Sequence, residues 1–195
     1  MTTNRVLAFV ALVLAAGAMV VGRPSTTPPG HIDVDRLAAM IAHEDDHVTA
    51  VELGTWLRDG KPGLRVIDVR PKADFDEYHL PHAENVPLPS IGKASFRPDE
   101  TLVLYSDGGA HAAQAWVMLR SLGFTNVYFL RGGLGEWLDD VMTPMLPTDA
   151  TPAEREAFRK IADLSTYFGG TPGVGPRPPA SSTSEKVKAM RRRGC

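Results

Sequence analysis

Cysteine is almost absent from this chain of 195 residues: the single one is Cys195, the last residue. One cysteine cannot form an intramolecular disulfide, and a zinc site with two cysteine ligands is excluded as well. Thiol chemistry in the folded body would require the chain terminus to reach it. An excess of one charge is also lacking, because the formal net charge is −2 and the pI is about 6.3. Nucleic acid is therefore not an expected partner.

Charge is absent from the 17 residues Val6 to Gly22, which follow a short segment carrying Arg5. A run of this length is typical of a signal-peptide core or of a short transmembrane anchor. We expect residues 1–22 to be one of these and residues 23–32, rich in proline and threonine, to be a linker. Both alternatives predict a body outside the cytoplasm, either anchored and facing the periplasm or exterior, or secreted to the periplasm after cleavage.

Bulky apolar side chains are scarce at the other end, where residues 169–184 are rich in glycine, proline and serine. Such a composition cannot bury a core, so residues 169–195 are expected to form a disordered tail ending in Cys195. Residues 185–195 carry five basic side chains and one acidic one, which leaves a net charge of −8 on residues 24–184. The tail is either simply solvated or attracted to anionic lipid or an acidic partner.

Between these ends lies enough chain for one domain, expected over residues 33–145, with residues 146–168 as an accessory helical segment. Capping and apolar spacing predict helices, and β-branched apolar runs predict strands. The expected helices are Asp35–His43, a helix capped by Thr49 and Glu52 that stops at Asp59-Gly60, Ala112–Leu122, and Ala153–Phe168; the expected strands are Leu64–Val69, Thr101–Tyr105 and Asn126–Leu130.

The strand–helix–strand order over about 30 residues predicts a right-handed βαβ unit, hence an α/β fold with a parallel sheet. Ligands in such folds bind at the carboxyl ends of strands, which draws attention to the turn after Tyr105. This turn contains Ser106, Asp107, Gly108, Gly109, Ala110 and His111. Its two glycines let backbone amides turn inward at a helix N-terminus, which is a favourable place for an anion.

From His47 to Val141 the chain resembles a single rhodanese (sulfurtransferase) domain. Four motifs in the family's order carry the resemblance. They are Asp68-Val69-Arg70 (D-x-R), Tyr78-His79-Leu80-Pro81-His82-Ala83-Glu84-Asn85-Val86-Pro87 (G-H-I-P-G-A-x-N-x-P), the strand and six-residue loop Thr101 to His111, and Gly132-Gly133 followed by Trp137 (G-G-x-x-x-W). The resemblance implies a three-layer parallel sheet flanked by helices, with Asp68 and Arg70 as a structural brace near the loop.

The resemblance also implies that the catalytic nucleophile is lost, because Ser106 occupies the position of the family's persulfide-carrying cysteine. A serine hydroxyl cannot form a persulfide, so the family's sulfur transfer cannot run on Ser106. We therefore expect a catalytically inactive domain that keeps an anion-binding loop, Ser106 to His111, and binds a small oxyanion or a protein partner. No cofactor and no metal is expected.

A sulfurtransferase or sulfur carrier that uses Cys195 or a partner's thiol is the alternative. The 25 steps from Gly170 to Cys195 give a flexible chain an r.m.s. reach of about 28 Å, enough to reach a site on a small domain. Cys195 could equally form a disulfide with another chain.

A serine hydrolase is disfavoured because Ser106 lies outside a G-x-S-x-G motif and no histidine is clearly placed as its base. A cysteine phosphatase is disfavoured because its nucleophile is missing.

A zinc protease is suggested by His43-Glu44-Asp45-Asp46-His47, which matches H-E-x-x-H. The capping box at Thr49 begins a new helix just after His47, so the two histidines are expected to straddle a helix end.

Other histidines and the tryptophans have ordinary expected roles. His79 is expected to pack and hydrogen-bond within its own loop, and His111, at the start of a helix, could bind an anion when protonated. Trp56, Trp116 and Trp137 are expected to pack in the core.

Overall fold

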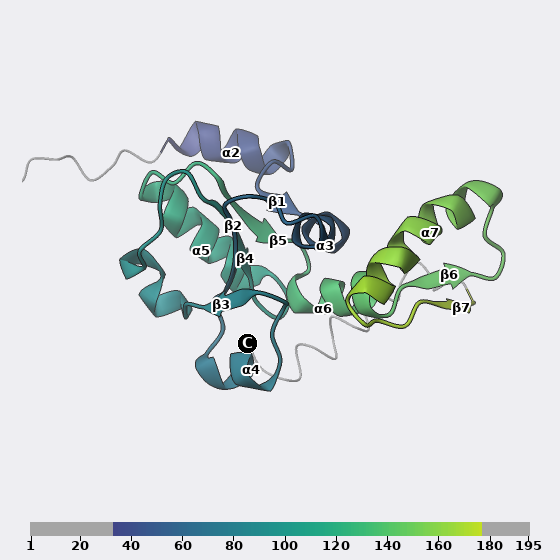
Figure 1. The fold of residues 1–195 in the computed structure, drawn as a ribbon. Coiled ribbons are helices and arrows are strands. Elements are labelled where there is room, and N and C mark those ends of the chain that lie inside the picture. The colour runs from purple at the N-terminus through teal and green to yellow at the C-terminus, as the bar shows by residue number, and fades with distance from the viewer. Residues whose placement is uncertain (1–32, 177–195) are drawn as a thin grey trace, which may run out of the picture. The chain divides into compact units, whose positions relative to one another are not determined.

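The computed structural model describes residues 33–176 (Figure 1), so Val6–Gly22 and Cys195 lie outside the described residues. The elements follow in the order α2 (Val34–Ala42), β1 (His47–Val48), α3 (Ala50–Arg58), β2 (Leu64–Asp68), α4 (Lys72–Glu77), β3 (Ala83–Asn85), the 3₁₀ helix η1 (Leu88–Lys93), β4 (Thr101–Tyr105), α5 (Ala110–Ser121), β5 (Val127–Leu130), α6 (Gly133–Trp137), the π-helical turn η2 (Leu138–Met142), β6 (Met145–Pro147), α7 (Pro152–Tyr167) and β7 (Gly173–Gly175).

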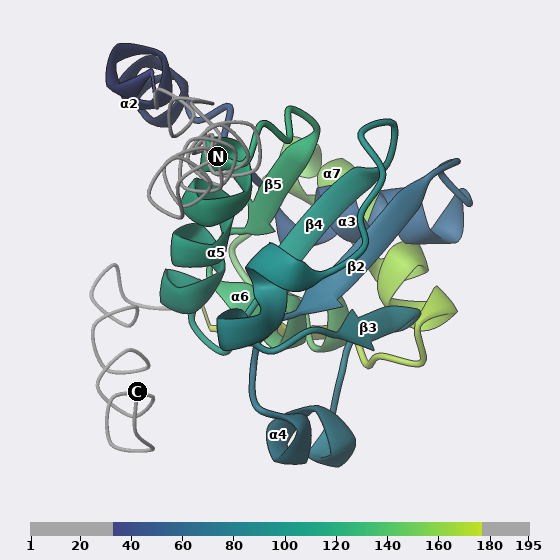
Figure 2. The ribbon, with the colours of Figure 1, turned by 90° about the vertical axis from the view of Figure 1, so that its left-hand side faces the viewer.

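Five strands form one parallel sheet in the order β1-β5-β4-β2-β3 (Figures 1 and 2). The α/β fold class and the parallel sheet are therefore confirmed. The central strands β2 and β4 are apolar on both faces, as strands covered on both sides must be. Val66 and Val103 belong to one buried cluster, whereas their neighbours Ile67 and Leu104 belong to another.

Helices cover both faces of this sheet, which gives the three layers expected. On one face Leu53 of α3 and Trp137 of α6 join Val66 and Val103. On the other face Trp116 and Leu119 of α5 join Ile67 and Leu104. The prediction that Trp116 and Trp137 pack in the core is confirmed, since they are 1% and 0% exposed. Trp56 is partly buried against the first of these clusters, as expected.

The predicted helix signals are confirmed at the residues that carry them. Thr49 Oγ1 accepts the amide of Glu52 at 3.2 Å, and Glu52 Oε2 accepts the amide of Thr49 at 2.8 Å, so the capping box is complete. The helix ends at Asp59-Gly60, where Gly60 has a φ of +64°. Gly123 has a φ of +94° and follows α5 as its expected stop.

The C-terminal helix α7 packs on α3 and η2. A Cβ built on Gly54 of α3 would lie 3.0 Å from Leu164 Cδ2, so this glycine lets α7 come close. Leu164 is 1% exposed, and the rings of Phe168 and Trp137 meet edge to face with centroids 5.1 Å apart. Residues 146–168, expected as an accessory segment, thus contribute Leu164 to the packing on this face.

The expectation of disorder from residue 169 onward is wrong for residues 173–175. These form β7, which pairs in parallel with β6, Met145 opposite Gly173 and Pro147 opposite Gly175. The composition of the segment predicts no such strand; pairing with β6 creates it, because glycine leaves room for the side chain of Met145, which lies 2.7 Å from a Cβ built on Gly173. Within residues 33–176, no helix is long and apolar enough to cross a membrane.

Candidate functional site

Ser106 directly follows β4 (Thr101–Tyr105), which is the middle strand of the parallel sheet (Figure 2). It is 2% exposed, and its hydroxyl makes no hydrogen bond to a side chain within residues 33–176. The loop that it begins runs to α5 and holds the six residues singled out in the sequence. This is the edge of a parallel sheet where the strand ends and helix N-termini of α/β folds gather.

The loop enters α5 through Gly109, whose φ of +89° is the left-handed region that favours glycine. Gly109 is the N-cap of the 12-residue helix, and no side chain caps it. Within residues 33–176, no carbonyl or side chain accepts a hydrogen bond from the backbone N–H groups of Asp107, Gly108, Gly109, Ala110 or His111. These five amides and the helix dipole together favour a bound anion.

The carbonyl side of the loop is held by the next turn of the sheet. The amide of Leu134 donates to Ser106 O at 2.9 Å, and that of Gly135 donates to Asp107 O at 3.1 Å. Gly133 lies directly behind the loop, because a Cβ there would overlap Ser106 O and come within 2.7 Å of Asp107 O. Leu134 and Gly135 therefore fix the loop's carbonyls, and Gly133 gives the room for this close approach.

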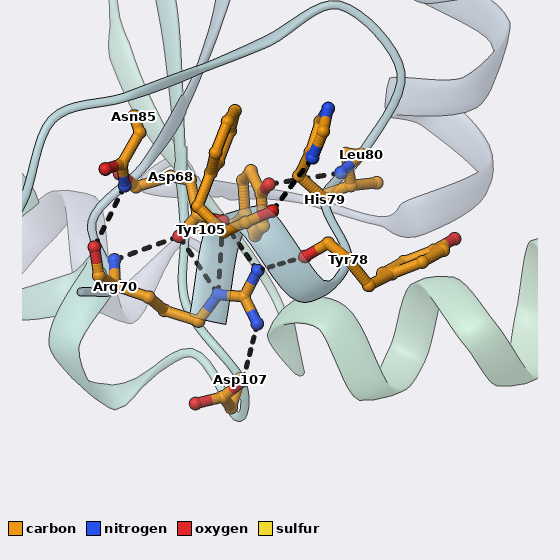
Figure 3. A network of polar contacts seen from close by, with 9 residues as sticks. Asp68, Arg70, Tyr78, His79, Leu80, Asn85, Tyr105 and Asp107 are labelled. Atoms are coloured by element: carbon orange, nitrogen blue, oxygen red, sulfur yellow. Dashed lines mark hydrogen bonds and ion pairs between the residues drawn. The ribbon is translucent and has the colours of Figure 1, made fainter. Parts of the chain in front are cut away.

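Asp68 and Arg70 form a buried ion pair beside the loop (Figure 3). Arg70 Nη2 donates to Asp68 Oδ2 at 2.7 Å and also to Tyr78 O at 2.7 Å. Arg70 Nη1 donates to Asp107 Oδ1 at 3.0 Å, so the guanidinium lies between two carboxylates. Burial opposes its charge, but these two carboxylates outweigh burial and raise the pKa of Arg70 above its ordinary value.

Asn85 and Tyr105 complete this network on the sheet side. Asn85 Nδ2 donates to Arg70 O at 2.9 Å and to Asp68 O at 3.2 Å. The hydroxyl of Tyr105 accepts the amide of Leu80 at 3.1 Å. Burial raises the pKa of Tyr105, and the nearby Asp68 carboxylate raises it further, whereas the hydrogen bond from the Leu80 amide lowers it.

The histidines of the H-E-x-x-H sequence do not share a helical face. His43 is the C-cap of α2, whereas His47 opens β1 and its Nδ1 lies 2.8 Å from Asp46 Oδ1. The prediction that they straddle a helix end is confirmed, so the arrangement that the motif needs is not formed.

His79 and His111 differ in their surroundings. Nδ1 of His79 lies 2.9 Å from Phe75 O, and its ring stacks on that of Phe75 with centroids 4.0 Å apart. His79 thus packs within its own loop, as predicted. His111 is exposed in the first turn of α5.

Two features of the site were missed by reasoning from the sequence. The contact between Arg70 and Asp107 joins residues 37 positions apart, and no local pattern indicates it. The amides of Leu134 and Gly135 donate into the loop, although Gly132-Gly133 was known only as part of a motif. A pair of glycines after a buried strand is the signal that could have indicated a close backbone approach. Cys195 lies outside the described residues.

Comparison with known proteins shows what this domain is similar to. Residues 49–140 match the rhodanese-like domain family. The probable adenylyltransferase/sulfurtransferase MoeZ of Mycobacterium tuberculosis is 27% identical over 155 residues, which cover 73% of this chain and 39% of that protein. The thiosulfate sulfurtransferase of Pseudomonas aeruginosa is 30% identical over 153 residues, which cover 59% of this chain and 56% of that protein. The chain thus spans well under two thirds of these relatives.

Among solved structures, the human single-domain sulfurtransferase TSTD1 is 29% identical with a TM-score of 0.43. The match covers 47% of this chain and 94% of the human protein.

Proposed function

From the premise that residues 49–140 form a rhodanese-like domain homologous to sulfurtransferases, we propose that it binds a small oxyanion or a protein partner and does not transfer sulfur. Ser106 occupies the position where the family's motif has its persulfide-carrying cysteine. A hydroxyl has a far higher pKa than a thiol and cannot hold a persulfide sulfur, so the transfer step has no nucleophile here.

The observation that carries the proposal is the set of five free amides from Asp107 to His111 at the N-terminus of α5. They supply hydrogen-bond donors and positive potential to one place, which is what an oxyanion needs. The Arg70–Asp68 pair and the amides of Leu134 and Gly135 support this loop from two sides. Ser106 adds a hydroxyl donor at the start of the loop, and no side chain within residues 33–176 is hydrogen-bonded to it as a base.

The test is a thiosulfate:cyanide sulfurtransferase assay on the full chain, run beside Ser106→Cys. We expect no turnover by the natural chain, and measurable turnover by Ser106→Cys, because the amides that lower a thiol's pKa are already in place. Titration calorimetry of the natural chain with thiosulfate measures the oxyanion binding directly.

Cys195→Ser is the matched control for this assay. Turnover by the natural chain that vanishes in Cys195→Ser would overturn the proposal and assign a sulfur-carrying role to the terminal thiol. A well-folded Ser106→Cys chain without turnover, together with no thiosulfate binding by the natural chain, would count against the anion-binding loop.

We also propose that the domain acts outside the cytoplasm, either anchored through residues 6–22 or released into the periplasm. The support is the uncharged run after Arg5 in the sequence. Mass spectrometry of the mature N-terminus distinguishes an anchored chain, which begins near Met1, from a cleaved one, which begins after the run. A mature chain found in the cytoplasm would contradict both.

A further inference from the structure

Acidic side chains are distributed unevenly over residues 33–176. This part of the chain carries 22 Asp and Glu against 13 Lys and Arg, yet residues 85–98 and 108–135 contain no carboxylate side chain at all. The two stretches hold η1 and α5, which lie side by side: a Cβ built on Gly92 would be 3.8 Å from Leu122 Cδ1. Both cover the same face of the sheet (Figure 2). The surface that they present to solvent is the α5–η1 face.

Large apolar side chains are exposed on the α5–η1 face. Val117, Met118 and Leu122 are 41%, 40% and 58% exposed, although Trp116 and Leu119 between them are buried. The outer side of the helix thus carries three apolar side chains beside the exposed His111 and Gln114. Apolar side chains gathered on an exposed helix face mark a candidate contact surface, because a solvated helix face is normally polar.

Three cations without a carboxylate partner within residues 33–176 belong to the α5–η1 face or to the neighbouring α2. Arg120 donates to Thr125 O at 2.7 Å and lies 3.1 Å from Met40 Sδ of α2, and Lys93 at the end of η1 is exposed. Burial lowers the pKa of Arg120, and repulsion from the nearby Arg36 of α2 lowers it further. Within residues 33–176, none of these three cations forms an ion pair.

We propose that the α5–η1 face docks on an anionic lipid bilayer. Exposed Val, Met and Leu side chains together with Lys and Arg are suited to the interface of a membrane, where acyl chains meet negative headgroups. The proposal favours lipid over an acidic protein because residues 6–22 are expected to insert in the membrane and only 11 residues separate them from α2. A linker of that length spans at most about 40 Å, so an anchored domain stays close to the bilayer.

The opposite layer of the molecule gives the contrast that makes the proposal testable. α3 and α7 pack there, and Tyr167 of α7 is 60% exposed. It is a large exposed side chain like Met118, but Glu154, Glu156 and Asp163 share its helix. A docked α5–η1 face shields Met118 and leaves Tyr167 in water.

The experiment places a spin label at Met118→Cys or at Tyr167→Cys in the full chain carrying Cys195→Ser, reconstituted in lipid vesicles. Accessibility to a water-soluble nickel relaxation agent is measured in neutral phosphatidylcholine vesicles and in vesicles with added phosphatidylserine. We expect the label at position 118 to lose accessibility when phosphatidylserine is present, and the label at position 167 to keep it. Equal accessibility of position 118 in both vesicles would overturn the proposal.

Charge reversal tests the electrostatic part on the same labelled chain. Lys93→Glu is expected to lower the ratio of shielded to accessible label about fivefold, because each basic side chain near an anionic surface contributes about 1 kcal/mol. Lys160→Glu, an exposed cation of α7, is the matched control and should leave the ratio unchanged. Shielding of position 118 without vesicles, or equal shielding at 118 and 167, would assign the face to a protein contact or to non-specific adsorption instead.

Discussion

Two strand-to-helix turns of this domain have similar sequences, but the backbone amides near them differ in whether they find a hydrogen-bond acceptor. Each joins a strand of the parallel sheet to a helix through a pair of glycines, Gly108-Gly109 before α5 and Gly132-Gly133 before α6. Each helix has a left-handed glycine as N-cap and no capping side chain; φ is +89° at Gly109 and +63° at Gly132. The first turn of α6 is closed, because its amides from Leu134 and Gly135 donate to Ser106 O and Asp107 O.

The turn before α5 is open, because its amides find no acceptor within residues 33–176. A glycine pair at a helix N-terminus is therefore not in itself a binding site. One such turn supplies the donors that fix its neighbour, and the neighbour keeps its own donors for a ligand. Substitutions that affect one turn and not the other test this division.

The largest effect on the free energy of unfolding is expected from Gly133→Ala. The new Cβ would overlap Ser106 O, and the φ of +59° is unfavourable for alanine. Backbone strain and steric displacement add to a loss of about 4 kcal/mol in the free energy of unfolding. Urea denaturation followed by tryptophan fluorescence measures it.

Gly60→Ala is the control for that substitution, since Gly60 has a similar φ of +64° and no atom within 4 Å of a built Cβ. It should cost only the strain, about 1–2 kcal/mol. Equal losses at both positions would show that the close approach to the loop's carbonyls is unimportant.

The second largest effect is expected from Arg70→Met, which should lower the free energy of unfolding by about 3 kcal/mol. It removes the partner of Asp68, which is fully buried, and leaves an uncompensated charge. The same denaturation experiment on Asp68→Asn/Arg70→Met separates charge from packing, because the double variant has no buried charge and should recover part of the loss. A double variant less stable than Arg70→Met would contradict the ion-pair interpretation.

The open turn should respond less, so Gly109→Ala is expected to cost about 1–2 kcal/mol of stability. A Cβ there would lie 3.4 Å from Gly132 N and from Leu130 O, which is tight but not overlapping, and the main penalty is the φ of +89°. Thiosulfate affinity should fall more clearly than stability, because the amides that face the ligand change direction. Unchanged affinity would place the ligand elsewhere.

Sequence patterns predicted the parts of the fold that local chemistry determines. The capping box at Thr49, the apolar strands β2 and β4, and Gly123 after α5 each depend on residues within a few positions of one another. The edge strands β1 and β3 have only two and three residues, too few for an alternating pattern to be visible. They form because the neighbouring strands offer hydrogen bonds.

The candidate site likewise has parts that local sequence predicts and parts that depend on long-range contacts. The loop from Ser106 to His111 was found because a glycine pair between a buried strand and a helix is a local signal. The ion pair of Arg70 with Asp107 and the amides that Leu134 and Gly135 donate depend on where the whole sheet brings these residues. Such long-range contacts decide which amides stay free, so the sequence predicts a loop and the fold decides that it is open.

Asp107→Asn should have the smallest effect, and it acts on the open turn and on its contact with Arg70. The Asp107 carboxylate is 66% exposed and places a negative charge beside the free amides, where it opposes an anion; Arg70 neutralises it only in part. Removing an exposed charge of this kind should tighten thiosulfate binding about threefold.

Titration calorimetry measures the change, and Asp99→Asn is the matched control, because Asp99 is 75% exposed and its loop precedes β4 at the other end of the strand. Higher salt should reduce the gain from Asp107→Asn, since screening weakens interactions between exposed charges. If both variants bound thiosulfate equally well, the anion would lie away from Asp107, and the free amides of this turn would not be its site.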